Sequence, residues 1–293
     1  MGNGVDVGIR PPGFRLPDDT RVGTVRVQVG DLTRSLEYYE RVLGLRGQDD
    51  GGVARLVVPD DGRVLLELHE RPGARPVPRG GLLGLFHFAI LLPDRKALGS
   101  FVNHVATLRA PVGMSDHAVS EAIYLSDPDG LGIEVYADRA RGSWRKDSTG
   151  QLMMTTEPLD LESVRDAAGG TPWTGMPAGS VMGHVHLHVG SLEGAEAFYH
   201  RALGFDKTVW TYPGALFMSA GGYHHHLGTN TWSQGGRPSE DHAQLLSWDV
   251  VIADRERAAA AAASLETSGY VVERTHDTLL VADPWGTRLR VVV

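Results

Sequence analysis

An internal repeat places the strongest constraint on the fold of this chain. Residues 29–44 recur without a gap as residues 189–204, an offset of 160 residues. A weaker repeat lies within each half, where strand-like runs end 63 residues apart, at Asp31 and Asp94 and again at Ser191 and Asp254. Repeats of this length usually mark a structural unit that packs against its own copies. The sequence therefore predicts four copies of one unit, two in each half.

Each unit is expected to contain a strand, a helix and then further strands. In the first unit, residues 22–29 alternate β-branched and polar side chains, as a half-buried strand does. Asp31 is a suitable N-cap for the helix that follows, and Gly44 is a suitable residue to end it. Strands are then expected at residues 54–58 and 64–69, around an Asp-Asp-Gly turn.

The repeat predicts two domains joined by a linker. In chain order the expected parts are an N-terminal arm (1–20), a first domain (21–138, with units 21–70 and 84–138), a linker (139–181) and a second domain (182–293, with units 182–232 and 244–293). The linker is polar and rich in Gly and Pro, with one short helix expected at residues 159–167.

Composition excludes several classes of function. The chain has no cysteine, which excludes disulfides and thiolate metal sites and suits a cytoplasmic location. Its formal net charge of −8, with no basic run, gives no footprint for nucleic acid. The longest apolar stretch, residues 82–92, is far shorter than the roughly 20 residues of a membrane span. Residues 1–20 lack the apolar segment of a signal peptide.

Histidines of the C-terminal half indicate a metal or acid–base site. His184, His186 and His188 alternate along one predicted strand, so all three side chains point to the same face. A consecutive run, His224 to His226, follows in the same half. Neutral imidazole is a common ligand for first-row transition metals and the usual acid–base group near pH 7.

Several longer strings resemble a known family. These are residues 87–94, 116–122 and 220–226, together with the Asp-Pro-x-Gly turns at 127–130 and 283–286. From about Arg21 onward the chain resembles the vicinal oxygen chelate superfamily, also called the glyoxalase/bleomycin-resistance superfamily, and most closely its Bacillus-type catechol-2,3-dioxygenase branch. The resemblance implies an α+β fold in which four βαβββ units pair into two glyoxalase-like domains. Each domain is then a curled mixed sheet that forms a cup.

The resemblance also implies where metal ligands would lie. The first-strand position, seven residues before the residue that ends the strand, falls on Thr24, His87, His184 and Ser247. The last-strand position, four residues beyond the turn glycine, falls on Leu66, Glu134, His226 and Arg290. Each expected domain therefore retains only two ligand-type residues.

A complete set of two histidines and one carboxylate needs a further residue in either domain. The fourth unit places Ser247 and Arg290 at the ligand positions, and arginine stays protonated and cannot bind a metal. Asp249 lies on the same face of its strand as Ser247, so our first hypothesis is a site of His184, His226 and Asp249.

Other ligand sets stay open. His224 could replace His226 in the first hypothesis. The second hypothesis is a site of His87 and Glu134, completed by His117 or Glu67. A third reading has no metal, with His87 as a hydrogen-bonded core residue.

The resemblance implies extradiol, or meta, ring cleavage of a catechol-type aromatic diol with O₂. The expected metal is Fe(II), with Mn(II) as an alternative. His225 is the candidate general base, with His224 and Tyr223 beside it as further candidate catalytic residues. Tyr223, Trp210, Phe217 and Trp232 are candidates to line an apolar slot for the ring.

Two other functions fit the same scaffold. One is a glyoxalase-type isomerase, lyase or thiol transferase, which would use zinc or nickel. The other is a non-enzymatic protein that binds an aromatic drug. Oxygen uptake and metal content distinguish the three, and a homodimer is compatible with each of them.

Overall fold

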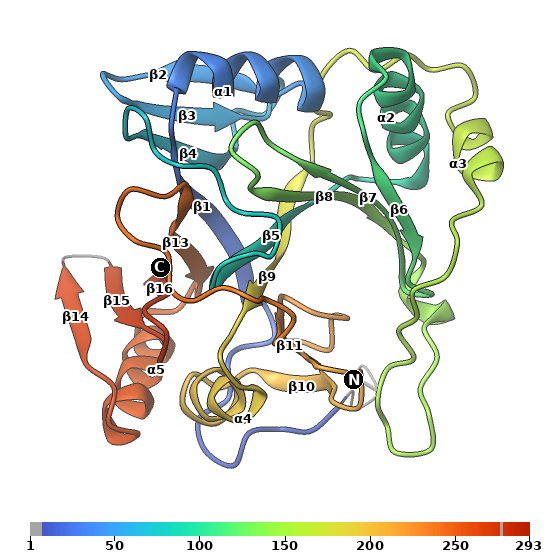
Figure 1. Cartoon of the computed structure of the whole chain (residues 1–293). Helices are drawn as coiled ribbons and strands as arrows, with labels where there is room; N and C mark the ends of the chain where they lie inside the picture. Colours follow the sequence, from blue (N-terminus) through green and yellow to red (C-terminus); the bar gives the residue numbers. More distant parts are fainter. Residues whose placement is uncertain (1–7, 276–277) are drawn as a thin grey trace.

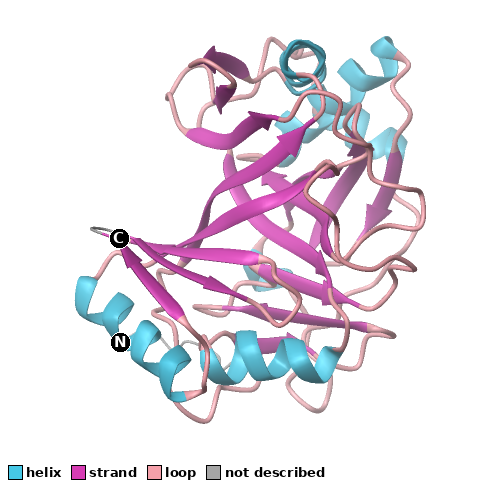
Figure 2. Cartoon of the chain, turned by 60° about the vertical axis from the view of Figure 1, so that its left-hand side comes forward, coloured by secondary structure: helices cyan, strands magenta, loops and turns pink. Residues whose placement is uncertain are grey.

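Two curled, eight-stranded mixed sheets form the centre of the molecule. The computed structural model describes residues 8–275 and 278–293, so residues 1–7 of the expected arm lie outside the described residues. Strands occupy the centre of the molecule and helices its periphery (Figure 2). This arrangement confirms the expected α+β class.

The first sheet, called sheet A, contains the second and third units. Its strands, in the order of hydrogen bonding, are β10 (Asp206–Val209), β11 (Ala215–Ser219), β12 (Leu227–Asn230), β9 (Val181–His188), β5 (Gly84–Leu91), β8 (Gly132–Asp138), β7 (Ser120–Ser126) and β6 (Gly113–Asp116).

The other sheet, sheet B, contains the first and fourth units. Its strands are β14 (Val272–Thr275), β15 (Thr278–Ala282), β16 (Arg288–Val292), β13 (Gln244–Val251), β1 (Arg21–Val29), β4 (Val64–Glu70), β3 (Val53–Val57) and β2 (Arg46–Asp49). In Figure 1 these are the blue first unit and the red fourth unit.

Helices follow the first strand of each unit. They are α1 (Leu32–Tyr38) continuing into η1 (Tyr39–Leu43), α2 (Arg95–Leu108), α4 (Leu192–Ala195) continuing into η3 (Glu196–Ala202), and α5 (Arg255–Thr267). The expected ends of the first helix are confirmed, because Asp31 accepts a hydrogen bond from the Arg34 backbone and Gly44 adopts a left-handed φ of 69°. No described helix is long and apolar enough to cross a membrane.

The units pair across the two halves of the chain. The first strands of the second and third units, β5 and β9, run antiparallel to each other, and β1 and β13 of the outer units do the same. Each expected domain, 21–138 and 182–293, therefore contributes one unit to sheet A and one to sheet B. The repeat specifies the units, but strand pairing between distant units is a tertiary contact that the repeat does not encode.

The segment between the halves contributes more than a connection. Within residues 139–181 lie the short η2 (Arg141–Ser143) and α3 (Leu161–Ala167), and Asp160 caps the latter. The expected helix is thus present, beginning two residues later. Leu152 of this segment is buried against Val209 and Phe217 of the third unit.

Candidate metal centre and active-site cavity

The pairing of β5 with β9 brings three candidate ligands together. Ala89 of β5 lies opposite His184 in the antiparallel register and opposite Glu134 of β8 in the parallel register. His87 is two residues before Ala89 and shares its strand face. Because Ala89 has a small side chain, His87, Glu134 and His184 meet over it.

Their geometry is that of a compact, buried cluster. Glu134 Oε2 lies 3.0 Å from His87 Nε2 and 3.2 Å from His184 Nε2. One ligand atom from each residue lies within 4.8 Å of the others. All three side chains are buried, and Glu134 is only 2% exposed. Two imidazoles and a carboxylate are the donor set of the facial triad that binds non-heme Fe(II).

The electrostatics of the cluster favour ligand-type protonation states. Burial raises the pKa of Glu134, but His184 and His87 lower it more, so the pKa lies well below its ordinary value. Burial lowers the pKa of His184 to about 4, although Glu134 acts in the opposite direction. An ionised carboxylate beside a neutral imidazole is the state in which these groups bind a metal.

Unsatisfied polar atoms support a cation at this place. His87 Nε2 lies close to the Glu134 carboxylate, yet it is buried and makes no hydrogen bond of acceptable geometry. A buried polar atom without a partner is costly, and it is resolved if the nitrogen lone pair binds an ion that the carboxylate also binds. His87, Glu134 and His184 therefore fit a metal ion of the kind that the family resemblance implies.

The third unit supplies only one ligand to the cluster. Gly228 of β12 lies opposite His186 of β9, as Glu134 lies opposite Ala89 in the second unit. Glycine offers no ligand, and a Cβ there would meet the His186 ring at 2.9 Å. The cluster therefore offers three candidate protein ligands, which would leave coordination positions for substrate.

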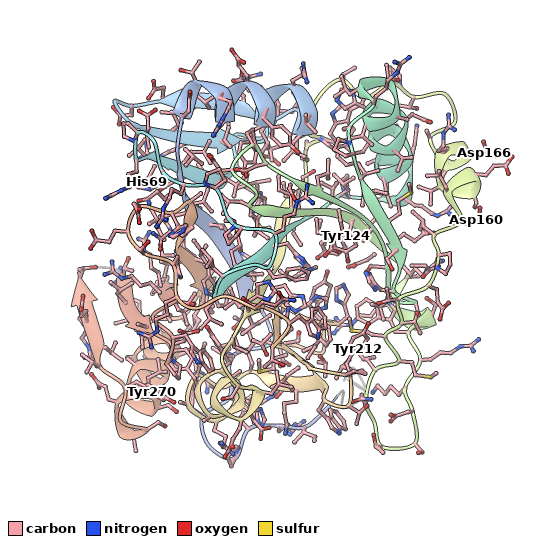
Figure 3. All side chains as sticks on the ribbon, in the orientation of Figure 1. His69, Tyr124, Asp160, Asp166, Tyr212 and Tyr270 are labelled. Atoms are coloured by element: carbon pink, nitrogen blue, oxygen red, sulfur yellow. The ribbon has the colours of Figure 1, made fainter. Side chains whose placement is uncertain are left out.

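A cavity of about 290 Å³ opens directly onto this cluster. His87 and Glu134 form part of its wall, and the rest is largely aromatic and imidazole side chains from both units of sheet A: Phe86, Tyr124, His186, Tyr212, Phe217, His225 and Trp232. Figure 3 labels Tyr124 of the second unit and Tyr212 of the third. The expected slot for a planar ring thus contains Phe217 and Trp232, whereas Trp210 and Tyr223 are not among its lining residues.

The structure does not bring His184, His226 and Asp249 together. Asp249 belongs to sheet B, where it accepts a hydrogen bond of 2.7 Å from Arg26. His226 Nδ1 instead accepts a hydrogen bond from the Ala220 backbone nitrogen at 3.2 Å. The first ligand hypothesis therefore fails on geometry, because it assumed that the third and fourth units share one cup.

The histidine run lies in a loop and not in a strand. Strand β11 ends at Ser219 and β12 begins at Leu227, so the side chains of residues 224–226 do not alternate between two faces. His225 reaches the cavity, while His224 is fully buried behind it. Tyr223 hydrogen-bonds to Tyr136 and Asp138 outside the cavity.

The two residues proposed to complete the His87–Glu134 set have other roles. His117 lines the cavity, with Nδ1 2.6 Å from the Thr155 carbonyl oxygen and Nε2 2.6 Å from the Tyr124 hydroxyl. Glu67 lies in sheet B and accepts a hydrogen bond of 2.9 Å from Arg26. The third member of the buried cluster is instead His184, which the first ligand hypothesis grouped with His226 and Asp249.

Sheet B has the same strand register as sheet A, but an arginine side chain lies where sheet A has its buried cluster. Its register places Glu67 opposite Arg26, just as sheet A places Glu134 opposite Ala89. The Arg26 guanidinium contacts both Glu67 and Asp249, so the protein itself supplies the cation there. A buried carboxylate needs such a partner.

Sequence reasoning did not identify Tyr124 or the linker residues of the cavity. Met154, Thr155 and Thr156 come from the segment interpreted as a linker, and Tyr124 sits on a strand with no distinguishing motif. A positive φ of 64° at Ala118 marks the tight turn that presents His117, a conformation that alanine rarely adopts. That strain is not visible in the sequence.

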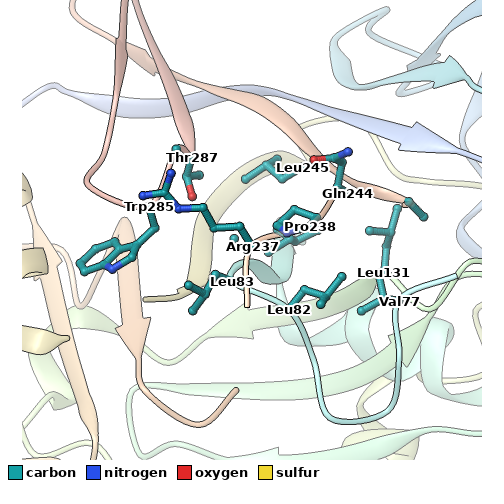
Figure 4. Close-up of a pocket in the computed structure, with 14 residues that line it drawn as sticks. Val77, Leu82, Leu83, Leu131, Arg237, Pro238, Gln244, Leu245, Trp285 and Thr287 are labelled. Carbon is teal, nitrogen blue, oxygen red and sulfur yellow. The ribbon is translucent and has the colours of Figure 1, made fainter. Parts of the chain in front are cut away.

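A second cavity, of about 240 Å³, lies among the starts of β5 and β13 and the turn before β16. Figure 4 shows its lining, mainly apolar side chains such as Leu82, Leu83 and Leu245, with Arg237 as the charged residue. No histidine or carboxylate is among its lining residues, so this cavity offers no comparable ligand set.

Comparisons with known proteins agree with this architecture. The profile of the Glyoxalase/Bleomycin resistance protein/Dioxygenase superfamily matches residues 21–135 and 181–291. Catechol-2,3-dioxygenase of Bacillus subtilis (strain 168), an enzyme, is 42% identical over 271 residues, which cover 91% of this chain and 95% of that protein.

Solved structures share the fold at low sequence identity. A candidate dioxygenase from Bacillus subtilis subsp. subtilis str. 168 has a TM-score of 0.64 at 14% identity, covering 95% of this chain and 86% of that one. Glyoxalase I from Zea mays has a TM-score of 0.57 at 18% identity, covering 94% and 92%. The chain belongs to the glyoxalase/bleomycin resistance protein/dioxygenase superfamily.

Proposed function

We propose that the protein is a metal-dependent extradiol dioxygenase that cleaves a catechol-type aromatic diol with O₂. The observation that carries this proposal is the buried set of His87, Glu134 and His184 at the base of an aromatic cavity. The identity of 42% with a catechol-2,3-dioxygenase supports the same reaction class.

His87, Glu134 and His184 would hold the metal, and Fe(II) is the ion that this donor set favours, with Mn(II) as the alternative. When bound, such an ion supplies Lewis acidity toward the diol oxygens and a template for the diol and O₂. The protein contributes the fixed donor set and a mostly apolar enclosure around it.

The cavity side chains can bind and orient a planar diol. Phe217 and Trp232 offer apolar surfaces for the ring, and the volume suits a small aromatic molecule. His225, which also lines the cavity, is placed to accept a hydroxyl proton from the substrate and to return it later.

Tyr124 forms a second polar contact point. If neutral His117 donates from Nδ1 to the Thr155 carbonyl, its Nε2 accepts the hydrogen bond from the Tyr124 hydroxyl. The phenol oxygen then retains its lone pairs toward the cavity. We propose that it orients a hydroxyl group of the diol.

The proposal is tested on protein purified without oxygen, by elemental analysis and by O₂ uptake with catechol. We expect about one iron or manganese per chain and O₂ consumption. Glu134→Gln and His184→Ala should lose metal and activity because each removes one of three ligands. His226→Ala is the matched control, a partly buried histidine outside the ligand set that should retain the metal.

Two outcomes would contradict this assignment. Retention of metal in Glu134→Gln together with its loss in His226→Ala would place the site elsewhere. Zinc or nickel at full occupancy, without O₂ uptake, would replace ring cleavage by glyoxalase-type isomerase chemistry. Circular dichroism on each variant separates loss of a ligand from loss of the fold.

A further inference from the structure

A chain of hydrogen bonds connects the cavity to the outside of the protein through three side chains. Asp138 ends β8 with its side chain 26% exposed, and its Oδ1 lies 2.9 Å from His224 Nε2. His224 is fully buried, and its Nδ1 lies 2.7 Å from Nδ1 of His225. His225 lines the cavity beside the candidate metal ligands.

The chemistry of these groups specifies the direction of each hydrogen bond. An ionised carboxylate can only accept, so His224 must carry its proton on Nε2. If His224 is neutral, its Nδ1 has a lone pair, and His225 donates to it from its own Nδ1. The remaining nitrogen of His225, Nε2, is left with a lone pair.

That nitrogen is available to a ligand. Among residues 8–275 and 278–293, none forms a hydrogen bond with Nε2 of His225, and the side chain forms part of the cavity wall. The opposite tautomer of His224 would set its Nε2 lone pair against the Asp138 carboxylate at 2.9 Å, which is repulsive.

Surrounding residues hold the three side chains in place. The Tyr223 hydroxyl donates to the same Asp138 oxygen at 3.2 Å, and the Tyr136 hydroxyl lies 2.7 Å from that of Tyr223. The His225 ring packs against Phe217, with the ring centroids 5.0 Å apart. Asp138 comes from the second unit and both histidines come from the third. These hydrogen bonds therefore cross the boundary between the second and third units, as the candidate metal site does.

We infer that Asp138 and His224 are positioning residues that fix the tautomer of His225, so that its Nε2 presents a lone pair to a hydroxyl group of the substrate. The substrate's identity rests on the proposed function, whereas the tautomer does not. Asp138 acts two side chains away from the cavity, and it is not among the cavity-lining residues.

The tautomer can be measured without turnover. On the full chain labelled with ¹⁵N-histidine, with and without Zn(II) as a diamagnetic ion, long-range ¹H–¹⁵N correlations at pH 7.5 report which nitrogen carries the proton. A His225→Gln spectrum assigns the signals. We expect the Nδ1–H form of His225 in the wild type and a mixture of tautomers in Asp138→Ala.

Kinetics give the second readout. If the proposed function holds, Asp138→Ala should lower kcat about 100-fold, within the range that general-base catalysis contributes, while KM changes by less than about threefold. Asp138→Glu should restore most of kcat, since a carboxylate is again available. Tyr223→Phe is the matched variant in the tautomer assay, because it removes a donor to Asp138 but not the acceptor for His224.

The outcomes separate the two proposals. An Nε2–H tautomer of His225 in the wild type, or an Nδ1–H tautomer that persists in Asp138→Ala, would overturn this inference. An unchanged kcat in folded Asp138→Ala would do the same. If the wild type consumes no O₂ with catechols, the proposed function fails, and the tautomer measurement still decides the role of Asp138.

Discussion

At the scale of a single residue, Asp127 shows how one buried carboxyl group couples the fold to pH. It lies in the turn before β8, where Oδ1 accepts hydrogen bonds from the backbone nitrogens of Asp129 and Leu131. Its Oδ2 accepts a hydrogen bond of 3.1 Å from the hydroxyl of Tyr39, a fully buried residue of the first unit. Burial raises the pKa of Asp127 to about 7, although the hydrogen bond from Leu131 acts in the opposite direction.

This shift predicts a pH-dependent stability. Because the pKa is higher in the folded state than in the unfolded chain, the folded state binds the proton more tightly between about pH 4 and pH 7. The contribution of Asp127 to the free energy of unfolding is therefore full below pH 4 and is lost as the pH rises to 7. The loss is at most on the order of 4 kcal/mol.

The variant Asp127→Asn should lack this dependence. In urea unfolding at pH 5 and pH 8, we expect its stability relative to the wild type to improve at the higher pH. Asp61→Asn, which removes an exposed carboxylate, serves as the comparison. If the difference in free energy of unfolding between Asp127→Asn and the wild type is equal at both pH values, Asp127 has no raised pKa in the folded state.

At the scale of secondary structure elements, local patterns predicted most of the fold. The strands expected at residues 54–58 and 64–69 are β3 (53–57) and β4 (64–70), because alternation and turn residues act within a few positions. The last-strand position that the resemblance placed at His226 was wrong, because His226 lies in the loop between β11 and β12. Gly221 and Gly222, with φ of 59° and 67°, turn the chain into a loop there.

One glycine of β9 yields a prediction at this scale. A Cβ on Gly183 would lie 1.9 Å from the Tyr136 hydroxyl, and the Tyr136 ring lies beside His184, with 5.0 Å between centroids. Gly183→Ala must therefore displace Tyr136 or the strand that carries His184. Metal affinity should fall by about 10- to 100-fold, as for other changes behind a ligand.

Calorimetric metal titration measures this effect. Gly142→Ala is the control, since a Cβ on Gly142 meets nothing within 4 Å. Adding Tyr136→Phe to Gly183→Ala removes the clashing hydroxyl and should recover part of the affinity. Wild-type affinity in Gly183→Ala would mean that the packing of Tyr136 does not position His184.

At the scale of the whole molecule, the pairing of units determined which ligand hypothesis could hold. The sequence identified His87, Glu134 and His184 as ligand-type residues, but it divided them between two expected domains. The pairing of β5 with β9, two strands about 100 residues apart in the sequence, brings His184 to His87 and Glu134. Such long-range pairing leaves no local pattern, because each unit offers an equivalent first strand to any other unit.

The same pairing predicts that neither half of the chain suffices for a metal site. Division after Gly169, an exposed residue between the halves, gives fragments 1–169 and 170–293. Each fragment carries one unit of each sheet. In fragment 1–169, β1 and β5 lack their partners β13 and β9, and in fragment 170–293, β13 and β9 lack β1 and β5. Unpaired strand edges and half-covered cores favour unfolding or aggregation.

Mixing the two fragments should therefore restore what neither has alone. We expect a one-to-one complex with native far-ultraviolet circular dichroism and one metal site, because His87 and Glu134 lie on one fragment and His184 on the other. Light scattering after size exclusion and metal titration measure both properties. If fragment 1–169 alone were monomeric, folded and able to bind metal as tightly as the intact chain, residues 21–138 would form an independent domain. The site would then not depend on the seam between the second and third units.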